Sequence, residues 1–207
     1  MDEEHIDELD QPRDWGPVKW ILALVMILLL VMWAVPYWAV KTDPSPSQVD
    51  KLEFNLTDVP ERLDSLYDAP RLEVTPTIRQ TALRITSQAC DPSQVCYAKA
   101  LFYYVRDNIN YISDPEYEYV QHPEETLLGA GDCEDKTILL HMLMRSIGIR
   151  SRIVVIPGHA YLQVRLPEAS SRYKDENGWV NLDTTCSSCD FGELPPFNDE
   201  KRKNIID

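Results

Sequence analysis

The sequence predicts an α+β fold in which helices come first and an antiparallel sheet follows. Three segments carry apolar residues at three- and four-residue spacing, which is the period of an amphipathic helix. After them come three segments in which β-branched residues dominate or apolar and polar residues alternate, as in strands. Helices and antiparallel strands kept apart along the chain are typical of α+β domains. With 207 residues, the chain has room for one such domain and for appendages at its ends.

The charge of the chain excludes a nucleic-acid partner. The formal net charge is −14, and phosphate binding needs a concentrated basic patch. Residues 1–40 hold seven acidic and two basic residues, which leaves 27 acidic and 18 basic residues for the rest of the chain. This remainder indicates a moderately acidic, well-solvated domain surface and identifies no substrate.

The N-terminal region predicts a disordered acidic tail over residues 1–16 and a membrane-spanning helix over residues 17–40. Trp20 to Val40 is an apolar run of 21 residues without a charge. At about 1.5 Å per residue, this length matches the roughly 30 Å hydrocarbon core of a bilayer. Aromatic residues collect mostly near the two ends of the run. A cleaved signal peptide is the alternative, but the run is long for one and no small-residue cleavage site follows.

These features predict a single-pass membrane protein with its main domain outside the cytoplasm. The positive-inside count is a tie, because Arg13 and Lys19 flank one end of the run, and Lys41 and Lys51 flank the other. The outward orientation is favoured by the number of cysteines, and the Asn55-Leu56-Thr57 glycosylation sequon is compatible with it.

The predicted domain covers residues 76–197 and is joined to the membrane helix by a juxtamembrane linker over residues 41–75. Its first helix falls between Pro76 and Ala89, and a more strongly amphipathic helix follows over residues 95–109. Residues 108–125 are rich in Asn, Asp, Pro and Tyr, which predicts an irregular segment.

A third helix is expected to begin at Cys133. Asp132 is suited to cap its N-terminus, and Asp135 stands three residues later, as in a capping box. Gly148 follows the last apolar turn, where a left-handed residue ends many helices. The Cys133 thiol would therefore lie at the positive end of the helix dipole, which favours the nucleophilic thiolate. The alternative is that Cys133 is a small buried residue that happens to begin a helix.

The strand-type segments cover residues 152–156, 159–166 and 179–183. The dipeptide Pro157-Gly158 separates the first two, and a polar loop separates the second from the third. Residues 198–207 form a charged tail that is expected to be loose.

A catalytic Cys133 would need a nearby base, and His159 is the candidate that remains after elimination. His5 belongs to the acidic tail, beyond the predicted membrane helix. His141 lies eight residues along the same helix, roughly 12 Å from Cys133. His122 is in the irregular segment beside a proline. His159 opens a strand directly after a turn, at a strand end where active sites can form.

Asp183 is the candidate for orienting His159. If the last two strands pair antiparallel, His159 and Asp183 are nearly symmetric about the intervening loop and can be cross-strand neighbours. A carboxylate there would bond one ring nitrogen and leave the other facing the thiol. The alternative is that Asp183 caps the turn at Thr184-Thr185 and that His159 is incidental.

These residues resemble the core of the transglutaminase-like superfamily. The matching blocks are Gly131-Asp132-Cys133-Glu134-Asp135, Gly158-His159-Ala160-Tyr161 and Trp179-Val180-Asn181-Leu182-Asp183-Thr184-Thr185. Their order and spacing agree over about residues 95–190, and the membrane segment is similar to that of membrane-anchored archaeal members.

The resemblance implies a papain-like fold with Cys133 as nucleophile, His159 as general base and acid, and Asp183 as the orienting residue. It implies a cysteine peptidase or amidase that needs no cofactor and acts on a protein or peptide substrate, cell-wall peptides included. The alternatives are a transglutaminase acting on protein glutamine, and a catalytically silent, membrane-tethered binding module.

The sequence departs from the family pattern at two places. Tyr161 stands where a tryptophan is usual after His-Ala, so an aromatic side chain is kept. The family's upstream aromatic that stabilises the oxyanion has no clear counterpart, and Tyr111, Tyr119 and Gln121 are the candidates.

Four further cysteines occur in two pairs, Cys90 with Cys96 and Cys186 with Cys189. They are candidates for disulfides, either within each pair or between the pairs. A structural Cys₄ zinc site is the second interpretation, and it fits the Cys-x2-Cys pair better than the Cys-x5-Cys pair. A redox-active pair at Cys186 and Cys189, as in a thiol–disulfide oxidoreductase, is the third. No catalytic metal is expected.

Overall fold

The structure is a computed structural model, and it describes residues 16–34, 45–54, 60–115, 117–199 and 201–207. The chain divides into two compact units, residues 1–42 and residues 43–207.

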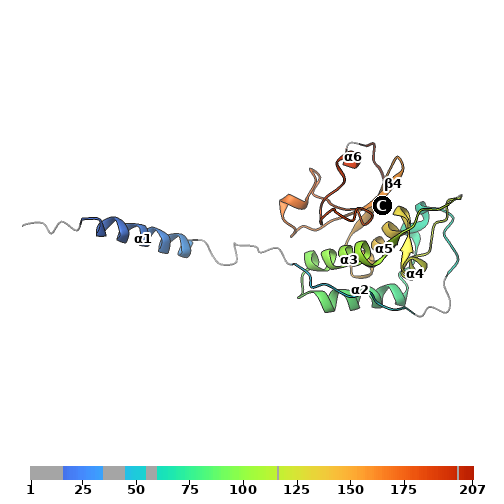
Figure 1. Cartoon of the computed structure of the whole chain (residues 1–207), viewed down its shortest axis with the longest axis horizontal. Helices are drawn as coiled ribbons and strands as arrows, with labels where there is room; N and C mark the ends of the chain where they lie inside the picture. Colours follow the sequence, from blue (N-terminus) through green and yellow to red (C-terminus); the bar gives the residue numbers. More distant parts are fainter. Residues whose placement is uncertain (1–15, 35–44, 55–59, 116, 200) are drawn as a thin grey trace, which may run out of the picture. The chain divides into compact units, whose positions relative to one another are not determined.

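The first unit contains helix α1 (Val18–Ala34), which covers most of the apolar run (Figure 1). The remainder of the predicted membrane segment, residues 35–40, lies outside the described residues, as do residues 1–15 of the predicted disordered tail. Among the helices that the structure describes, none has both the length and the apolar character needed to cross a bilayer. The membrane-spanning helix therefore stays a prediction from the sequence.

The second unit has the predicted α+β architecture. Its three main helices lie where the periodicity places them: α2 (Pro76–Ala89), α3 (Gln94–Asn108) and α5 (Cys133–Ser146) (Figure 1). Thr75 caps α2 by accepting a hydrogen bond from the Ile78 N–H, and Ser93 caps α3 in the same way with the Cys96 N–H.

Helix α5 is the centre of this unit, because it packs against α2 and α3 and also against the sheet. Its apolar side chains are completely or almost completely buried, as expected for a helix covered on several sides: Ile138, Leu139, Leu140, Met142, Leu143 and Met144. The helix ends in a Schellman motif, with Gly148 at a φ of 78° and the Ile149 N–H donating to the Met144 carbonyl at 3.0 Å. A buried central helix holds its first residue, Cys133, in a fixed place.

The sheet has four antiparallel strands in the order β5-β4-β3-β6. The three predicted strands appear as β3 (Ser151–Ile156), β4 (His159–Val164) and β5 (Val180–Leu182). The fourth strand, β6 (Asn204–Ile206), corrects the expectation of a loose tail. Three residues of β6 pair with β3, and Ile206, opposite Ile153, is buried, so this end of the chain lies on the sheet edge.

The segment before Cys133 is less irregular than expected. Strand β1 (Asn110–Tyr111) pairs in parallel with β2 (Ala130–Gly131), and the short helix α4 (Pro123–Thr126) lies between them in the sequence. The pairing places Tyr111 opposite Gly131, two residues before Cys133. Two residues per strand are too few to leave a visible period in the sequence.

Part of the predicted linker packs into the folded unit. Leu52 is buried, and its N–H donates to the Tyr104 hydroxyl at 3.1 Å. The 3₁₀-helix η2 (Leu66–Arg71) buries Leu66 and Ala69. The remaining short elements are η3 (Ser171–Tyr173) and α6 (Pro196–Asp199).

The four paired cysteines form two local disulfides. Cys90 is bonded to Cys96, and Cys186 is bonded to Cys189. Of the open alternatives, the structure therefore has disulfides within each pair, and it has neither a bridge between the pairs nor a Cys₄ zinc site. All five cysteines lie in described residues, and Cys133 is the one that remains free.

Candidate active site

Cys133 occupies the first position of α5, and its side chain is partly exposed. The predicted capping box is present. Asp132 accepts hydrogen bonds from the Glu134 and Asp135 N–H groups at 3.0 and 3.2 Å, and Asp135 accepts one from the Asp132 N–H at 3.1 Å. These bonds fix the first turn of the helix, so the thiol stays at the positive end of the helix dipole.

His159 is placed by the hairpin that joins β3 and β4. Ile156 pairs with His159 across the two-residue turn Pro157-Gly158, and Gly158 has a φ of 76°, which other residues rarely adopt. The hairpin thus fixes His159 as the first residue of β4. The Cys133 side chain is one of the groups that raise the pKa of this ring, so the two side chains lie near each other. The first turn of α5 and the start of β4 therefore bring a thiol and an imidazole together.

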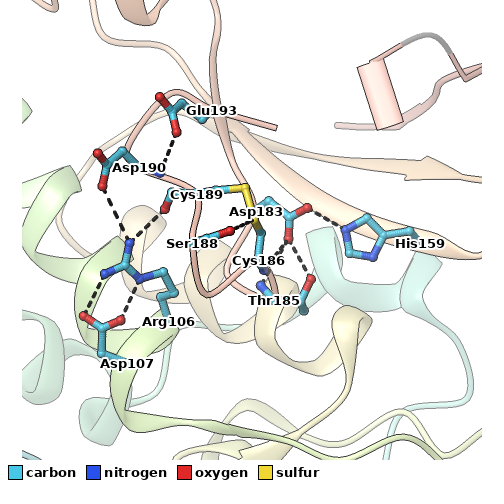
Figure 2. Close-up of a disulfide and its surroundings, with 10 residues drawn as sticks. All are labelled: Arg106, Asp107, His159, Asp183, Thr185, Cys186, Ser188, Cys189, Asp190 and Glu193. Carbon is cyan, nitrogen blue, oxygen red and sulfur yellow. Dashed lines mark hydrogen bonds and ion pairs between the residues drawn. A yellow bond between two sulfur atoms is a disulfide. The ribbon is translucent and has the colours of Figure 1, made fainter. Parts of the chain in front are cut away.

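Asp183 reaches His159 from the neighbouring strand. Strands β4 and β5 pair with Leu162 opposite Leu182, and continuing this register places Asp183 diagonally across from His159. The two are neighbours, although diagonal ones rather than directly opposite as their spacing suggested. The His159 Nε2 atom lies 2.8 Å from Asp183 Oδ2 (Figure 2). This contact leaves Nδ1 of the ring available to the thiol.

The second oxygen of Asp183 caps the turn that follows β5. Asp183 Oδ1 accepts hydrogen bonds from the Thr185 N–H at 3.1 Å, the Thr185 hydroxyl at 2.7 Å and the Cys186 N–H at 3.3 Å (Figure 2). One oxygen of Asp183 therefore contacts His159 and the other caps the turn, so both contacts that the two interpretations require are present. A carboxylate held in this way has little freedom to rotate.

The electrostatics of the site favour a charged imidazole. Burial by itself lowers the pKa of His159, but the hydrogen bonds with Asp183 and Cys133 outweigh it and raise the pKa to about 9. Burial likewise opposes ionisation of Asp183, yet the bonds from His159 and Thr185 hold its pKa below the ordinary value. At neutral pH the site thus holds a protonated His159 beside an ionised Asp183.

Two buried polar residues of α5 complete the support of the thiol, and sequence analysis missed both. The Thr137 hydroxyl lies 2.7 Å from the Cys133 carbonyl oxygen and 3.2 Å from that of Ala160, so it ties the Cys133 turn to the residue after His159. Lys136 donates to the Ile109 carbonyl at 2.8 Å at the end of α3. The signal that could have found them is two consecutive polar residues on a helix that is otherwise buried.

The remaining histidines are engaged elsewhere in the part of the chain that the structure describes. His141 is buried, with Nδ1 2.9 Å from the Ser151 hydroxyl, and burial lowers its pKa to about 4. His122 lies 2.5 Å from Glu124. His5 lies outside the described residues. His122 and His141 thus each have a hydrogen-bond partner other than Cys133.

Of the three candidates for the upstream oxyanion-stabilising residue, Tyr111 is the one on a strand paired next to Cys133, since it lies opposite Gly131. The charge of Cys133 contributes, after burial, to a raised pKa of the Tyr111 hydroxyl. Tyr119 instead bonds Glu125 at 3.2 Å, and the Gln121 side chain accepts a bond from Thr126.

Carboxylates gather beside the thiol. Side-chain oxygens of Glu118, Asp132 and Glu134 can lie within 4.8 Å of one another, which makes them the group of described residues with spacing suited to a metal ion. Burial, followed by repulsion from Asp132 and Glu118, raises the pKa of Glu134 to about 8. Because Asp132 already accepts the hydrogen bonds that cap α5, we assign no metal to this group.

Comparisons with known proteins return a family model and a crystal structure. A family model described as the transglutaminase-like superfamily matches residues 79–184, a range that includes Cys133, His159 and Asp183. A crystal structure from Cytophaga hutchinsonii, described as that of a candidate cysteine protease, is similar at 19% identity with a TM-score of 0.37. That match covers 52% of this chain and 41% of the other, so the chain spans about two fifths of the neighbour's length. No curated protein matches the chain.

Proposed function

Because the chain belongs to the transglutaminase-like superfamily, we propose that it is a thiol-dependent amide hydrolase with Cys133 as its nucleophile. The observation that carries the proposal is the 2.8 Å contact between His159 and Asp183, together with the contribution of the Cys133 side chain to the raised pKa of His159. A nucleophile, a base and an orienting carboxylate on three separate elements form the arrangement that acyl transfer through a covalent intermediate requires.

The mechanism follows from the charges in the site. His159 takes the proton of the Cys133 thiol, and the pKa of about 9 means that the ring keeps this proton at neutral pH. The thiolate attacks the carbonyl carbon of an amide, and the protonated ring then donates its proton to the leaving amine. Water, deprotonated by the same ring, attacks the thioester, releases the carboxylic acid and restores the thiol.

Hydrolysis is the outcome we favour over transfer to a second amine. Nothing in the sequence identifies a site for a second amine substrate. Transglutaminase activity is the alternative, and a silent binding module is the second alternative. A thiol–disulfide oxidoreductase at Cys186 and Cys189 is less consistent with a disulfide whose turn caps Asp183.

The place of action that we propose is a membrane surface outside the cytoplasm. The support is the uncharged run from Trp20 to Val40 together with two disulfides in the second unit. Protease added to intact cells should digest residues 43–207 if they face outward. Protection of this unit in intact cells, with digestion only after lysis, would contradict the proposed orientation.

The substrate class is best tested by a screen of the full chain in detergent micelles against peptides, glutamine-containing proteins and cell-wall peptides. Mass spectrometry should detect new carboxyl termini, together with an acyl adduct on the peptide that contains Cys133. The same screen with an added primary amine separates hydrolysis from transfer, because transfer would attach the amine to the product. If neither product nor Cys133 adduct forms on any substrate, the silent binding module becomes the better account.

A further inference from the structure

The turn of residues 184–189 follows Asp183, the residue whose carboxylate contacts His159, and donates hydrogen bonds to that carboxylate. Its Thr185 N–H, Thr185 hydroxyl and Cys186 N–H all donate to one oxygen of Asp183, at distances of 2.7 to 3.3 Å. The other oxygen is the one that lies 2.8 Å from His159. Because three donors occupy one oxygen, the turn decides which oxygen is presented to the imidazole.

The turn is itself held by a disulfide and by a hydrogen bond from Arg106 (Figure 2). The Cys186–Cys189 disulfide closes it, and the Cys189 N–H donates to the Cys186 carbonyl at 3.2 Å. On the side of α3, Arg106 donates to the Cys189 carbonyl at 2.8 Å and is held by Asp107 at 2.6 Å. The Arg106 side chain is only 15% exposed. The backbone of the turn therefore has fixed points at the disulfide and on α3.

We propose that the Cys186–Cys189 disulfide is a positioning element, which holds the turn of residues 184–189 so that Asp183 points one oxygen at His159. The inference rests on the proposed function and adds a residue pair that acts through Asp183 without touching substrate. Opening the disulfide lets Cys186 move relative to Asp183. The carboxylate then rotates more freely, and its hold on the imidazolium weakens.

The other disulfide, between Cys90 and Cys96, provides a matched control. Cys90 caps the C-terminus of α2, and Cys96 lies in the first turn of α3, so this disulfide joins two helix ends. It also closes a short loop, with a sequence separation of 6 against 3 for the Cys186–Cys189 pair. A general loss of stability should follow from opening either disulfide, whereas a change at His159 should follow only from opening the Cys186–Cys189 disulfide.

The test measures alkylation of Cys133 in the full chain by iodoacetate and by iodoacetamide, from about pH 6 to pH 10, a range that brackets ordinary and raised histidine pKa values. A protonated His159 attracts the anionic reagent but not the neutral one, so the ratio of the two rates reports the imidazolium. Cys133 is the free cysteine of the chain, and it remains so in a Cys186→Ser/Cys189→Ser variant. No substrate needs to be known.

In the wild type, the rate ratio should fall with a midpoint near pH 9. In Cys186→Ser/Cys189→Ser, the midpoint should move downward by about one pH unit or more, toward the ordinary histidine value of about 6.5. The Cys90→Ser/Cys96→Ser variant should keep the wild-type midpoint. The groups that face His159, namely Cys133, Asp183 and the stacked Tyr161 ring, are the same in all three proteins, as are the carboxylates around the thiol.

A second pair of variants keeps the test decisive if the disulfide variant does not fold, as judged by circular dichroism. Thr185→Val removes the hydroxyl that donates to Asp183 at 2.7 Å and should move the midpoint in the same direction. Thr185→Ser keeps a hydroxyl and should restore the wild-type profile.

Two different failures can be told apart. A wild-type rate ratio that does not change with pH would refute the protonated His159 beside Cys133 on which the proposed function depends. A normal wild-type profile that Cys186→Ser/Cys189→Ser and Thr185→Val leave unchanged would overturn the positioning role alone.

Discussion

Replacing Cys133 with alanine is expected to reduce amide cleavage by at least about 10³-fold, because the variant cannot form an acyl-enzyme. The loss should appear in kcat rather than in KM, since the side chain acts on the reacting carbon and contributes little to ground-state binding. The measurement is the initial rate of amine release from the best substrate of the screen, compared at equal protein concentration.

Folding should be preserved in this variant. Cys133 is partly exposed at the first position of α5, and the capping bonds of that turn are made by the neighbouring residues Asp132 and Asp135. Equal melting temperatures of wild type and variant would therefore show that lost activity reflects lost chemistry. Full cleavage by a folded Cys133→Ala protein would refute the assignment of the nucleophile and, with it, the proposed mechanism.

Replacing His159 with glutamine is expected to lower kcat/KM by about 10² to 10⁴-fold, the usual contribution of a general acid and base. Glutamine can still hydrogen-bond Asp183 but can neither accept the thiol proton nor donate one to the leaving amine. The rate should be compared with that of His141→Gln, which removes a buried histidine bonded to Ser151 rather than to the thiol. A loss of similar size in both variants would argue for a structural effect in place of a chemical one.

The pH dependence of the wild-type activity is an independent test of the role of His159. The folded-state pKa is raised to about 9, so the proton needed by the leaving amine is present below that pH and is lost as the pH rises through it. Activity of the wild type should therefore fall above about pH 9. Glu134, whose pKa is raised to about 8, also titrates near this pH. If a Glu134→Gln variant shows the same fall of activity at high pH, the fall is due to His159.

The local features of the site could be predicted from sequence because each depends on residues close together in the chain. The start of α5 is predicted by Asp132 and Asp135, and its end by Gly148. The structure has a capping box at the start and a Schellman motif at the end. The strand beginning at His159 is likewise marked by the Pro157-Gly158 turn before it. The α+β class follows from the same periodicities.

The contacts that complete the site are tertiary, and sequence left them open or missed them. The choice among Tyr111, Tyr119 and Gln121 depends on the two-residue pairing of β1 with β2, which carries no periodic signal. Thr137 and Lys136 support the thiol through contacts with β4 and the end of α3, which are 20 or more residues away in the chain.

By itself, the sequence determined the fold class and the helix that begins at Cys133, and it predicted Cys133, His159 and Asp183 as site residues, because these depend on local periodicity, capping and spacing. The tertiary structure alone decided how the four other cysteines pair, that β6 joins the sheet, and that Asp183 serves both His159 and a disulfide-closed turn. The physical reason is that one carboxylate has two oxygens with separate partners. The turn donors are close in the sequence, whereas His159 is 24 residues away and comes close to Asp183 only because β4 pairs with β5.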